Sequence, residues 1–491
     1  MSSTDFFRTR LDTMIDMRHP LAVLATRMPW SQIEASLAPL LAHKNRVGRV
    51  VEDVDLFGTS AELVSAGVSP RGRRRLPIRL MVSLLYLKHA FNESDESLVE
   101  RWSENVVWQF FSGMEYYEPR LPCDATQIGR FRRVLGEAGV EQLLKTTIEA
   151  AVSMNAIKPA EFEMIIVDTT VQEKAIAHPT DSRLLEVARA KITRLAKWAG
   201  IKLKQSFEHE GTQLRRKAGG YAHAKQFKRL RRAVKRQRTI LGIVLRDVRL
   251  KMHALPRDAQ IKLELWLGRA GRIQSQQRSD KNKLYALHAP EVECIGKGKA
   301  RKPYEFGVKV SLAVTHKQGL MVGARSFPGN PFDGHTLAQQ LEQTTTLLQD
   351  IGVRPMTAVV DLGFRGMEVD AAIAPVQTIH RGRSRTLTNQ QRRWLKRRQA
   401  IEPAIGHTKH DNRMDRCWLQ GATGDALHAV LCAAGFNIRW LLRAILRRGL
   451  AALFLSLHAV GLWVLSLVDN SLSRQFSTEL GSHLSQRASP G

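Results

Sequence analysis

Two aspartates stand at the ends of short apolar runs that are typical of buried strands. In EFEMIIVDTTVQ the run Met164–Val167 ends in Asp168, and in PMTAVVDLGFRG a second run ends in Asp361. A strand buried in a sheet can hold a carboxylate rigidly at its carboxyl end. Two such carboxylates could bind divalent cations, although each aspartate could instead be an ordinary turn residue after a strand.

A third acidic residue lies within a strongly basic segment. In RRQAIEPAIGHTKH, the residues Arg398, Glu402 and Lys409 are spaced by four and seven, which places them on one face of a helix. A metal-binding carboxylate flanked by cations that grip phosphate explains this pattern, and a ladder of surface ion pairs is the alternative. Pro403 would clash inside a continuous helix, so we expect a kink there or a helix whose first turn begins at Glu402.

Three carboxylates of this kind fit two-metal cleavage of a phosphodiester. Two divalent ions about 4 Å apart would activate the attacking oxygen and stabilise the leaving oxygen. Mg²⁺ suits a site of few carboxylates plus substrate phosphate and water, with Mn²⁺ as a substitute. We therefore expect Asp168, Asp361 and Glu402 to be both the catalytic and the metal-binding residues.

The intervening sequence predicts the elements that must position these residues. KPYEFGVKVSLAVTH and GLMVGARSFPG are typical of an antiparallel strand pair joined at residues 316–319. DGHTLAQQLEQTTTLLQDIG predicts a helix opened by Asp333 and closed by Gly352. The order of elements predicts an α/β protein: a ribonuclease-H-like mixed sheet core with a basic helical insertion and an N-terminal all-helical domain.

The domain organisation follows from these patterns. We expect an N-terminal helical domain at residues 1–155, which binds DNA or serves as a packing or dimerisation bundle. We expect a catalytic domain at residues 160–445, with the helical insertion at about 181–300, and a hydrophobic C-terminal extension at 446–491. Within the extension, Gly449–Val468 carries no formal charge and is long enough to cross a bilayer. We interpret it as a buried or oligomer-forming helix and do not expect a membrane partner.

The charge of the chain is concentrated in two places. Of a net charge of +29 over 491 residues, residues 181–300 carry 30 basic and 10 acidic residues, and residues 381–400 carry 8 basic residues and no acidic one. Abundant positive charge on a globular chain indicates a polyanionic partner. In the insertion, Arg229, Arg231, Arg232 and Lys235 predict a helix surface that contacts a phosphate backbone, and a merely solvated face is the alternative.

The cysteines and the N-terminus exclude some classes of protein. The four cysteines are widely separated and lack CxxC spacing, which argues against a disulfide framework or a zinc knuckle. The first residues contain acids and have no apolar run followed by a cleavage site, so we expect no secretory signal. These features predict a cytoplasmic protein.

The ordered motifs resemble those of a known family. VDTT around Asp168, VVDLGFRG around Asp361 and RRQAIEPAIGHTKHDNRM around Glu402 are similar to the DDE transposases of bacterial insertion sequences, specifically the insertion-sequence-five family. KPYEFGVKVSL, GNPFDGHTL and the N-terminal LPIRLMVSLLYLKHAFNESDESLVERWSENVVWQFFSG are similar as well. The resemblance covers roughly residues 40–445.

The resemblance implies a catalytic triad of Asp168, Asp361 and Glu402 with two Mg²⁺ ions. It implies that Arg398 and Lys409 belong to a signature Tyr-x2-Arg-x3-Glu-x6-Lys, in which Leu395 here replaces the tyrosine. The expected function is cleavage of the inverted-repeat ends of an insertion sequence and strand transfer into target DNA by a homodimer or larger synaptic assembly. The alternatives are a nuclease without strand transfer, an inactive DNA-binding relic, and a membrane-anchored nucleic-acid-binding protein.

Overall fold

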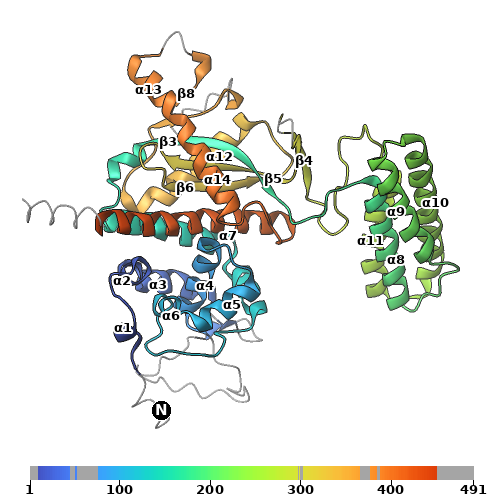
Figure 1. Cartoon of the computed structure of the whole chain (residues 1–491), viewed down its shortest axis with the longest axis horizontal. Coiled ribbons are helices and arrows are strands. Elements are labelled where there is room, and N and C mark those ends of the chain that lie inside the picture. The colour runs from blue at the N-terminus through green and yellow to red at the C-terminus, as the bar shows by residue number, and fades with distance from the viewer. Residues whose placement is uncertain are drawn as a thin grey trace, which may run out of the picture.

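A computed structural model describes residues 9–41, 43–44, 50–51, 76–296, 298, 302–364, 376–383 and 387–449. It has a mixed α/β architecture, with a curved sheet, helices on both sides of it and a separate helical bundle (Figure 1). The hydrophobic run predicted at 449–468 lies outside the described residues except for its first position.

The sheet contains six strands. They are β3 (Met164–Glu173), β4 (Glu293–Gly296), β5 (Tyr304–Thr315), β6 (Met321–Phe327), β7 (Thr357–Val359) and β8 (Gln377–Ile379). A separate two-stranded pair joins β1 (His43–Lys44) and β2 (Val50–Val51). The hairpin of β5 and β6 and the strand before Asp361 are confirmed.

The strand order places β3 at the centre of the sheet. β5 pairs antiparallel with β3 on one edge and with β6 and β4 on the other. On the far side, β3, β7 and β8 pair in parallel. The resulting order β6-β5-β3-β7-β8, in which only β5 runs against the others, is compatible with a ribonuclease-H-like core.

Seven helices precede the sheet in the described part of the chain. They are α1 (Leu11–Met14), α2 (Pro20–Arg27), α3 (Trp30–Leu41), α4 (Ile78–Ala90), α5 (Asp95–Glu104), α6 (Val106–Phe111) and α7 (Ala125–Ser153). Ser94 caps α5 with a reciprocal capping box, as its place before an acidic turn predicts. Gly136 interrupts α7 with a φ of 60° that glycine adopts readily.

A long helix at Gly421–Gly449 lies between the sheet and the N-terminal helices (Figure 1, red and unlabelled). The Asn437 side chain joins the two layers: its Oδ1 accepts from the Met321 N–H of β6, and its Nδ2 donates to Thr147 Oγ1 of α7. This helix is long and apolar enough to cross a membrane, but 72% of its most apolar window is buried within the protein. It is a core helix, and its buried residues belong to one hydrophobic core shared by the N-terminal helices and the sheet.

The segment between β3 and β4 folds into a bundle with its own core. Its helices are α8 (Asp181–Trp198), α9 (Glu208–His223), α10 (Phe227–Lys251) and α11 (Arg257–Ser275). In α10 the apolar residues Ile240, Val244 and Val248 face inward as their spacing predicts. Phe227, at the start of α10, is 57% exposed, and Ala233 and Gln237 are the buried residues of that half of the helix.

Three helical pieces follow the sheet helix α12 (Asp333–Leu348), which ends at Gly352 after a short turn, as predicted. They are α13 (Asn389–Arg397), a 3-10 turn η7 (Arg398–Ala400) and α14 (Ile401–His410). The predicted interruption before Pro403 is therefore confirmed. Because Pro403 lies in the first turn of α14, its missing N–H removes no helical hydrogen bond.

Candidate active site

Asp168 and Asp361 lie side by side because their strands run parallel. In the pairing of β3 with β7, Ile166 faces Val359, and each aspartate follows two positions later. Neighbouring strands are about 4.8 Å apart, and residues two apart point to the same face. Asp168 is in the middle of β3 rather than at its predicted end, because the β-branched residues that follow continue the pairing with β5.

The guanidinium group of Arg398 connects these two aspartates. Its Nη1 donates to Asp168 Oδ2 at 3.2 Å, and its Nη2 lies 3.7 Å from Asp361 Oδ1. Arg398 begins the 3-10 turn before α14, and its side chain is only 13% exposed. The sequence places Arg398 among DNA-contacting residues, whereas here it is the cation between the two carboxylates.

The environment of Asp168 disfavours its charged form. Burial raises the pKa of its carboxyl group, and the neighbouring carboxylates Asp361 and Asp333 act in the same direction. The Thr169 N–H, which donates to Asp168 Oδ1 at 2.7 Å, and the Arg398 guanidinium oppose this rise in pKa. A cation at this position would therefore be stabilised by several negative groups.

Asp333 is a fourth acidic residue of the cluster, which sequence reasoning treated only as the start of a helix. Its Oδ1 accepts from Thr169 Oγ1 at 2.9 Å and pairs with Lys309 Nζ at 2.8 Å. Gly363, two residues after Asp361, leaves room for it: a Cβ there would lie 2.7 Å from Asp333 Oδ2. The acidic residue in the motif GNPFDGHTL was the only sequence signal for this role. Only the fold shows that Asp333 contacts Thr169 of β3 and Lys309 of β5.

Glu402 lies on α14, the helix that packs against β3, one turn after Arg398. Its side chain is exposed. Within the described residues, the three predicted carboxylates are not a set of ligand atoms that all lie within 4.8 Å of one another. The structure thus brings Asp168 and Asp361 together and places Glu402 on an adjacent element.

Lys409 belongs to a separate ion-pair network on the same helix. Its Nζ lies 3.0 Å from Glu305 Oε2 and 3.9 Å from Glu173 Oε1, and Lys302 pairs with Glu173 from the other side. Glu305 is buried. Lys409 therefore already has carboxylate partners where the sequence predicts a contact with DNA.

The helix α13 presents the second basic segment. Its residues Arg392, Arg393, Lys396 and Arg397 are exposed, whereas Leu395, at the tyrosine position of the signature, is buried in the core. Trp394 is partly buried, and its main-chain oxygen lies 3.3 Å from His316 Nε2. Leu395 therefore has a packing role, and the cations lie on the opposite face.

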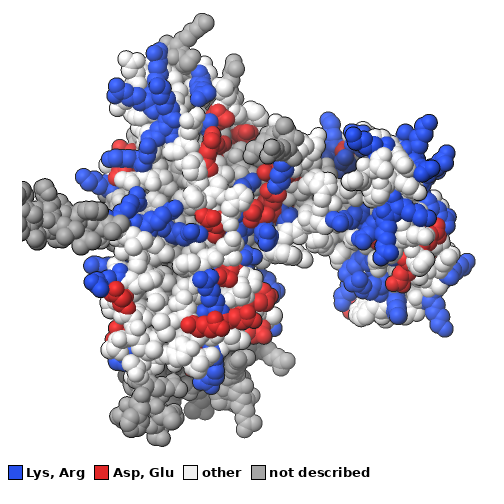
Figure 2. All heavy atoms as spheres, in the orientation of Figure 1, with Lys and Arg blue, Asp and Glu red and all other residues white. Residues whose placement is uncertain are grey.

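The four predicted DNA-contacting residues of the bundle lie on the outer surface of α10. Arg229, Arg231, Arg232 and Lys235 are all exposed, and none of them is within 4.0 Å of a carboxylate of the described chain. Nearby, Arg236 is paired with Glu210. Figure 2 shows that basic side chains cover much of the bundle and the projection formed by α13.

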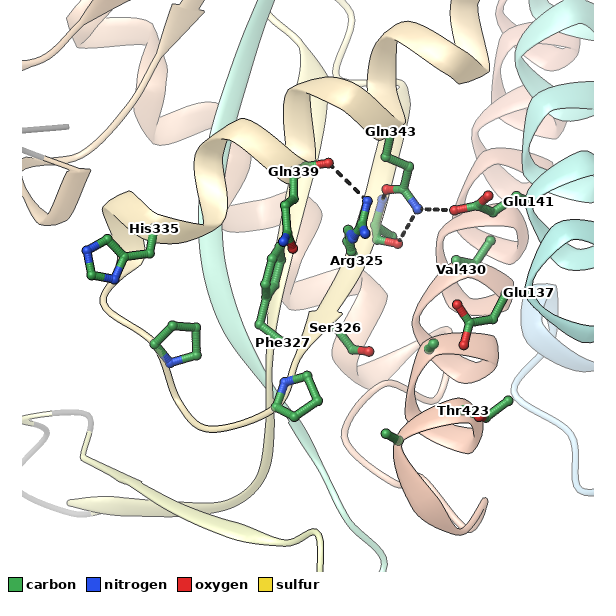
Figure 3. Close-up of a pocket in the computed structure, with 15 residues that line it drawn as sticks. Glu137, Glu141, Arg325, Ser326, Phe327, His335, Gln339, Gln343, Thr423 and Val430 are labelled. Atoms are coloured by element: carbon green, nitrogen blue, oxygen red, sulfur yellow. Dashed lines mark hydrogen bonds between the residues drawn. The ribbon is translucent and has the colours of Figure 1, made fainter. Parts of the chain in front are cut away.

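A cavity of about 620 Å³ lies away from these carboxylates (Figure 3). It is lined by residues of α7, β6, α12 and the long helix, among them Glu137, Arg325 and His335. Gln343 closes one side by donating to Glu141 Oε1 at 2.6 Å and to the Ala324 main-chain oxygen at 3.1 Å. Because Asp168, Asp361 and Glu402 do not line it, this cavity is not part of the candidate active site.

Comparisons with known proteins relate parts of the chain to transposase families. Residues 43–134 match the family described as Transposase domain (DUF772), and residues 365–442, which include Glu402, match the family described as Transposase DDE domain. The chain is 40% identical over 223 residues to a protein of Rhizobium meliloti described as "Uncharacterized protein ORF8 in nfe locus", covering 45% of this chain and 95% of that protein. No solved structure matches the chain. The chain belongs to the DDE transposases of insertion sequences.

Proposed function

We propose that this protein binds the inverted-repeat ends of its insertion sequence and catalyses two-metal phosphodiester hydrolysis followed by strand transfer. The observation that carries the proposal is the position of Asp168 on β3 close to Asp361, two residues after the end of the parallel strand β7, with the guanidinium group of Arg398 between the two carboxylates. The strand order supports a ribonuclease-H-like core, and the motifs support a place in the insertion-sequence-five family.

The residues present fit a divalent cation. The two aspartates already share the positive charge of Arg398, and burial of Asp168 together with nearby carboxylates makes added positive charge favourable. Asp168, Asp361 and Glu402 would hold the ions, for which oxygen-preferring Mg²⁺, or Mn²⁺, is suited. Bound ions would supply the activation of water and the stabilisation of the leaving oxygen.

The residues of the chain have distinct roles in this proposal. Asp168 and Asp361 remain fixed by the sheet, so that their carboxylates need little reorganisation. Arg398 is released from the aspartates and contacts a phosphate oxygen of the DNA, which its planar guanidinium group suits. Asp333 holds Lys309 and Thr169 in place behind Asp168. No covalent link between protein and DNA is required.

Two basic surfaces would hold the DNA. The exposed cations of α10 and those of α13 flank the carboxylates along the chain and can neutralise backbone phosphates without reading sequence. We propose a homodimer or larger assembly, because two DNA ends must be cut and brought together. We also propose that the protein acts in the cytoplasm.

The decisive experiment replaces each acidic residue singly by its amide: Asp168→Asn, Asp361→Asn and Glu402→Gln. Each variant should lose Mg²⁺-dependent cleavage of DNA that contains the element ends, while binding and folding remain. The matched control is Glu342→Gln on α12, whose side chain is 66% exposed and lies away from the cluster, and which should cleave normally. Normal cleavage by any of the three test variants would contradict the catalytic assignment.

A nuclease on the same core would hydrolyse DNA without joining it. Pre-cut ends with a free 3′-hydroxyl group, incubated with target plasmid and Mg²⁺, distinguish the two activities. A transposase yields joined products, and a nuclease yields none. An inactive relic would bind the ends but neither cut nor join them.

A further inference from the structure

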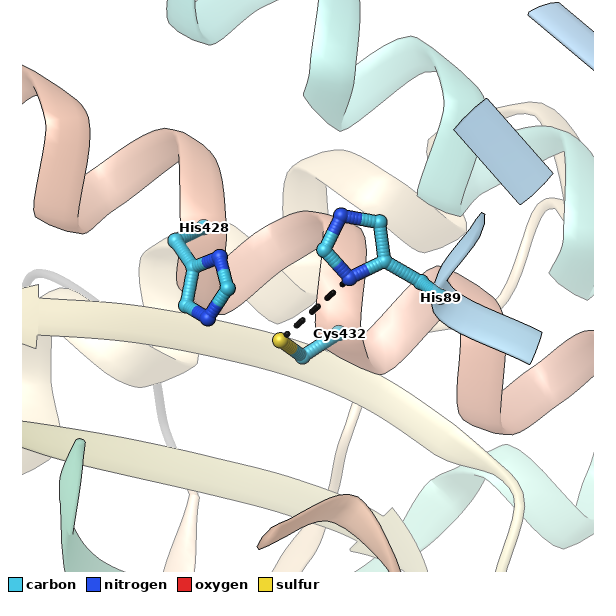
Figure 4. A group of neighbouring side chains, drawn as sticks. All are labelled: His89, His428 and Cys432. Carbon is cyan, nitrogen blue, oxygen red and sulfur yellow. Dashed lines mark hydrogen bonds between the residues drawn. The ribbon is translucent and has the colours of Figure 1, made fainter. Parts of the chain in front are cut away.

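A second cluster of metal-binding side chains lies in the core, away from the carboxylates. His89 comes from α4, and His428 and Cys432 come from the long helix, where a spacing of four places them on one face (Figure 4). All three are buried, and one ligand atom from each lies within 4.8 Å of the others. The cluster joins residues 343 positions apart in the chain.

The spacing within the cluster fits a tetrahedral zinc site. Zinc binds imidazole nitrogen at about 2.0–2.1 Å and thiolate sulfur at about 2.3 Å, so two such ligands at a tetrahedral angle lie about 3.6 Å apart. The distance from His89 Nδ1 to Cys432 Sγ is 3.6 Å. This separation equals one edge of the expected tetrahedron, and in the metal-free protein it also fits a hydrogen bond between the thiol and the imidazole nitrogen.

The hydrogen bonds around the cluster also suit a metal site. His428 Nε2 lies 2.9 Å from the Arg413 main-chain oxygen. If Nε2–H donates to that oxygen, the lone pair of Nδ1 is directed elsewhere, which is the usual arrangement of a histidine that binds metal through its other nitrogen. Asn412 contacts both the main chain and the ring of His89: its Nδ2 donates to the His89 main-chain oxygen at 2.9 Å, and its main-chain oxygen lies 3.5 Å from His89 Nδ1.

Two buried polar atoms at this place lack a partner. Within the described residues, His89 Nε2 and Asn412 Oδ1 have no hydrogen-bond partner although both are inaccessible to solvent. Leaving a buried polar group unsatisfied costs about 1–3 kcal/mol. The unpartnered Nε2 is the ring nitrogen of His89 other than Nδ1, the nitrogen that lies 3.6 Å from Cys432 Sγ. Asn412 contacts His89 from the loop after α14 through its Nδ2 atom.

Burial and the nearby cations Lys88 and Arg132 lower the pKa of His89 and His428, and these cations are partly compensated. Lys88 and Arg132, which lie close to the cluster, are both paired with Asp95, and the Arg413 side chain donates to the Asn92 main-chain oxygen. Zinc bound by one thiolate would add a single positive charge. Imidazole and thiolate are the ligands that zinc selects over the oxygen ligands of magnesium.

We propose that His89, His428 and Cys432 bind one Zn²⁺ ion that fastens α4 of the N-terminal region to the long helix beneath the sheet. The contact there is already close, because a Cβ at Gly435 would lie 2.5 Å from His89 Cβ. The site is structural: its ligands are buried, and it is distinct from the carboxylates that would bind Mg²⁺. It does not depend on the proposed transposase activity.

The test measures zinc in the purified full-length protein after gel filtration with a weak chelator. We expect about one zinc per chain, and a large loss of zinc in Cys432→Ser and His428→Gln. The matched control is Cys417→Ser, another buried free cysteine nearby, which should keep its zinc. A zinc-free wild-type protein, or a Cys432→Ser variant with full zinc content, would overturn the proposal.

A second measurement covers the case in which these variants do not fold. The wild-type protein, loaded with Co²⁺ in place of zinc, should show a thiolate-to-cobalt charge-transfer band. A strong zinc chelator should lower the melting temperature by several degrees, and Zn²⁺ but not Mg²⁺ should restore it. Absence of the band together with an unchanged melting temperature would exclude the site. Asp168→Asn should retain zinc, so failure of this proposal and failure of the catalytic one are separable.

Discussion

At the scale of single residues, the candidate active site is a group of carboxylates that the fold holds closer together than is favourable in the metal-free protein. Asp168 is buried beside Asp361 and Asp333, and Arg398 and Lys309 compensate only part of this charge. Sites arranged for function commonly carry such a stability cost. The cost can be measured by removing one charge.

The first prediction concerns Asp168 and pH. Its folded pKa is raised above the unfolded value of 3.8, so its favourable contribution to stability is fully present below that value and is lost as the pH rises through the folded pKa. Asp168→Asn should therefore stabilise the metal-free protein at neutral pH, by up to about 1 kcal/mol, while abolishing cleavage. Asn can still accept the Thr169 N–H.

Thermal unfolding in the absence of divalent ions, at neutral pH and near pH 4, checks this prediction. The increase in stability of Asp168→Asn over the wild type should be smaller at the lower pH, because the wild-type carboxyl group is protonated more often there. Glu342→Gln serves as the exposed control and should change stability by less than about 0.5 kcal/mol at either pH. If Asp168→Asn lowers the stability of the protein, the attraction between Arg398 and the charged Asp168 carboxylate outweighs the cost of burying that charge.

The second prediction concerns the pair of Asp333 and Lys309. Asp333→Ala leaves Lys309, whose side chain is 12% exposed, without its carboxylate and removes the acceptor of Thr169. We expect a loss of about 2–3 kcal/mol in the free energy of unfolding, below the roughly 3–5 kcal/mol for a fully buried pair because Asp333 is partly exposed. Denaturant unfolding measures the loss.

The double variant Asp333→Ala with Lys309→Met separates a charge effect from a packing effect. It should recover part of the lost stability, because no unpaired ammonium group remains. Equal losses in the single and double variants would mean that Lys309 finds another partner, such as the Pro331 main-chain oxygen to which it already donates.

At the scale of elements, the basic helix α10 is amphipathic in two different ways. Its C-terminal half packs into the bundle core through Ile240, Val244 and Val248. Its N-terminal half is mostly exposed to solvent and carries the cations. A helix that served only to close the bundle would not need, on this half, four cations that lack a carboxylate partner in the described part of the chain. The arrangement favours a contact with DNA.

The third prediction tests that contact. Changing Arg229, Arg231, Arg232 and Lys235 together to glutamine should weaken DNA binding and reduce the slope of log affinity against log salt. Four lost phosphate contacts at roughly 0.9 each would reduce the slope by about 3.6. Binding measured at several salt concentrations gives the slope directly.

A control variant removes equal charge from the same bundle. The exposed residues Arg257, Lys262, Arg278 and Lys281 lie on or just after α11. Their change to glutamine should alter the slope much less. Equal slopes for both variants would mean that total charge matters and that α10 has no special role.

At the scale of the whole molecule, the described residues form two large hydrophobic cores and a small third cluster that includes Ala289. One is continuous from the N-terminal helices through the long helix to the sheet, and the other belongs to the bundle of α8–α11. The N-terminal helices therefore share a hydrophobic core with the sheet. Asn437 is the polar group that joins their layer to the sheet.

The fourth prediction is that Asn437→Ala loosens both layers together. The change removes three hydrogen bonds, two with the Met321 main chain and one with Thr147, and leaves buried groups unsatisfied. We expect a loss of about 2–4 kcal/mol. Hydrogen exchange should accelerate in α7 and β6 alike. Thr147→Val, which breaks only one of these bonds, should have a smaller effect, and acceleration confined to one layer would contradict a shared core.

Particular residues show how far sequence reasoning reached. Apolar runs ending in Asp168 and Asp361, the hairpin turn and the proline near Glu402 are local signals, and the strands, the hairpin and the helix break they predict are present. The exposure of Phe227 and the pairing of Lys409 with Glu305 were not predictable, because both depend on which elements pack nearby. The cysteine spacing argues against a zinc knuckle, but it has no bearing on a site assembled from α4 and the long helix.

The sequence by itself determined the local features: the periodicities that form strands and helices, the acidic positions, and the two stretches that hold nearly all the excess charge. These features depend on residues that are close together in the sequence, so they can be predicted from the sequence alone. Only the tertiary structure decided that Asp333 joins Asp168, that Arg398 lies between two aspartates, and that His89 meets Cys432. Those contacts follow from parallel pairing and helix packing, which bring together residues whose distance along the chain carries no signal.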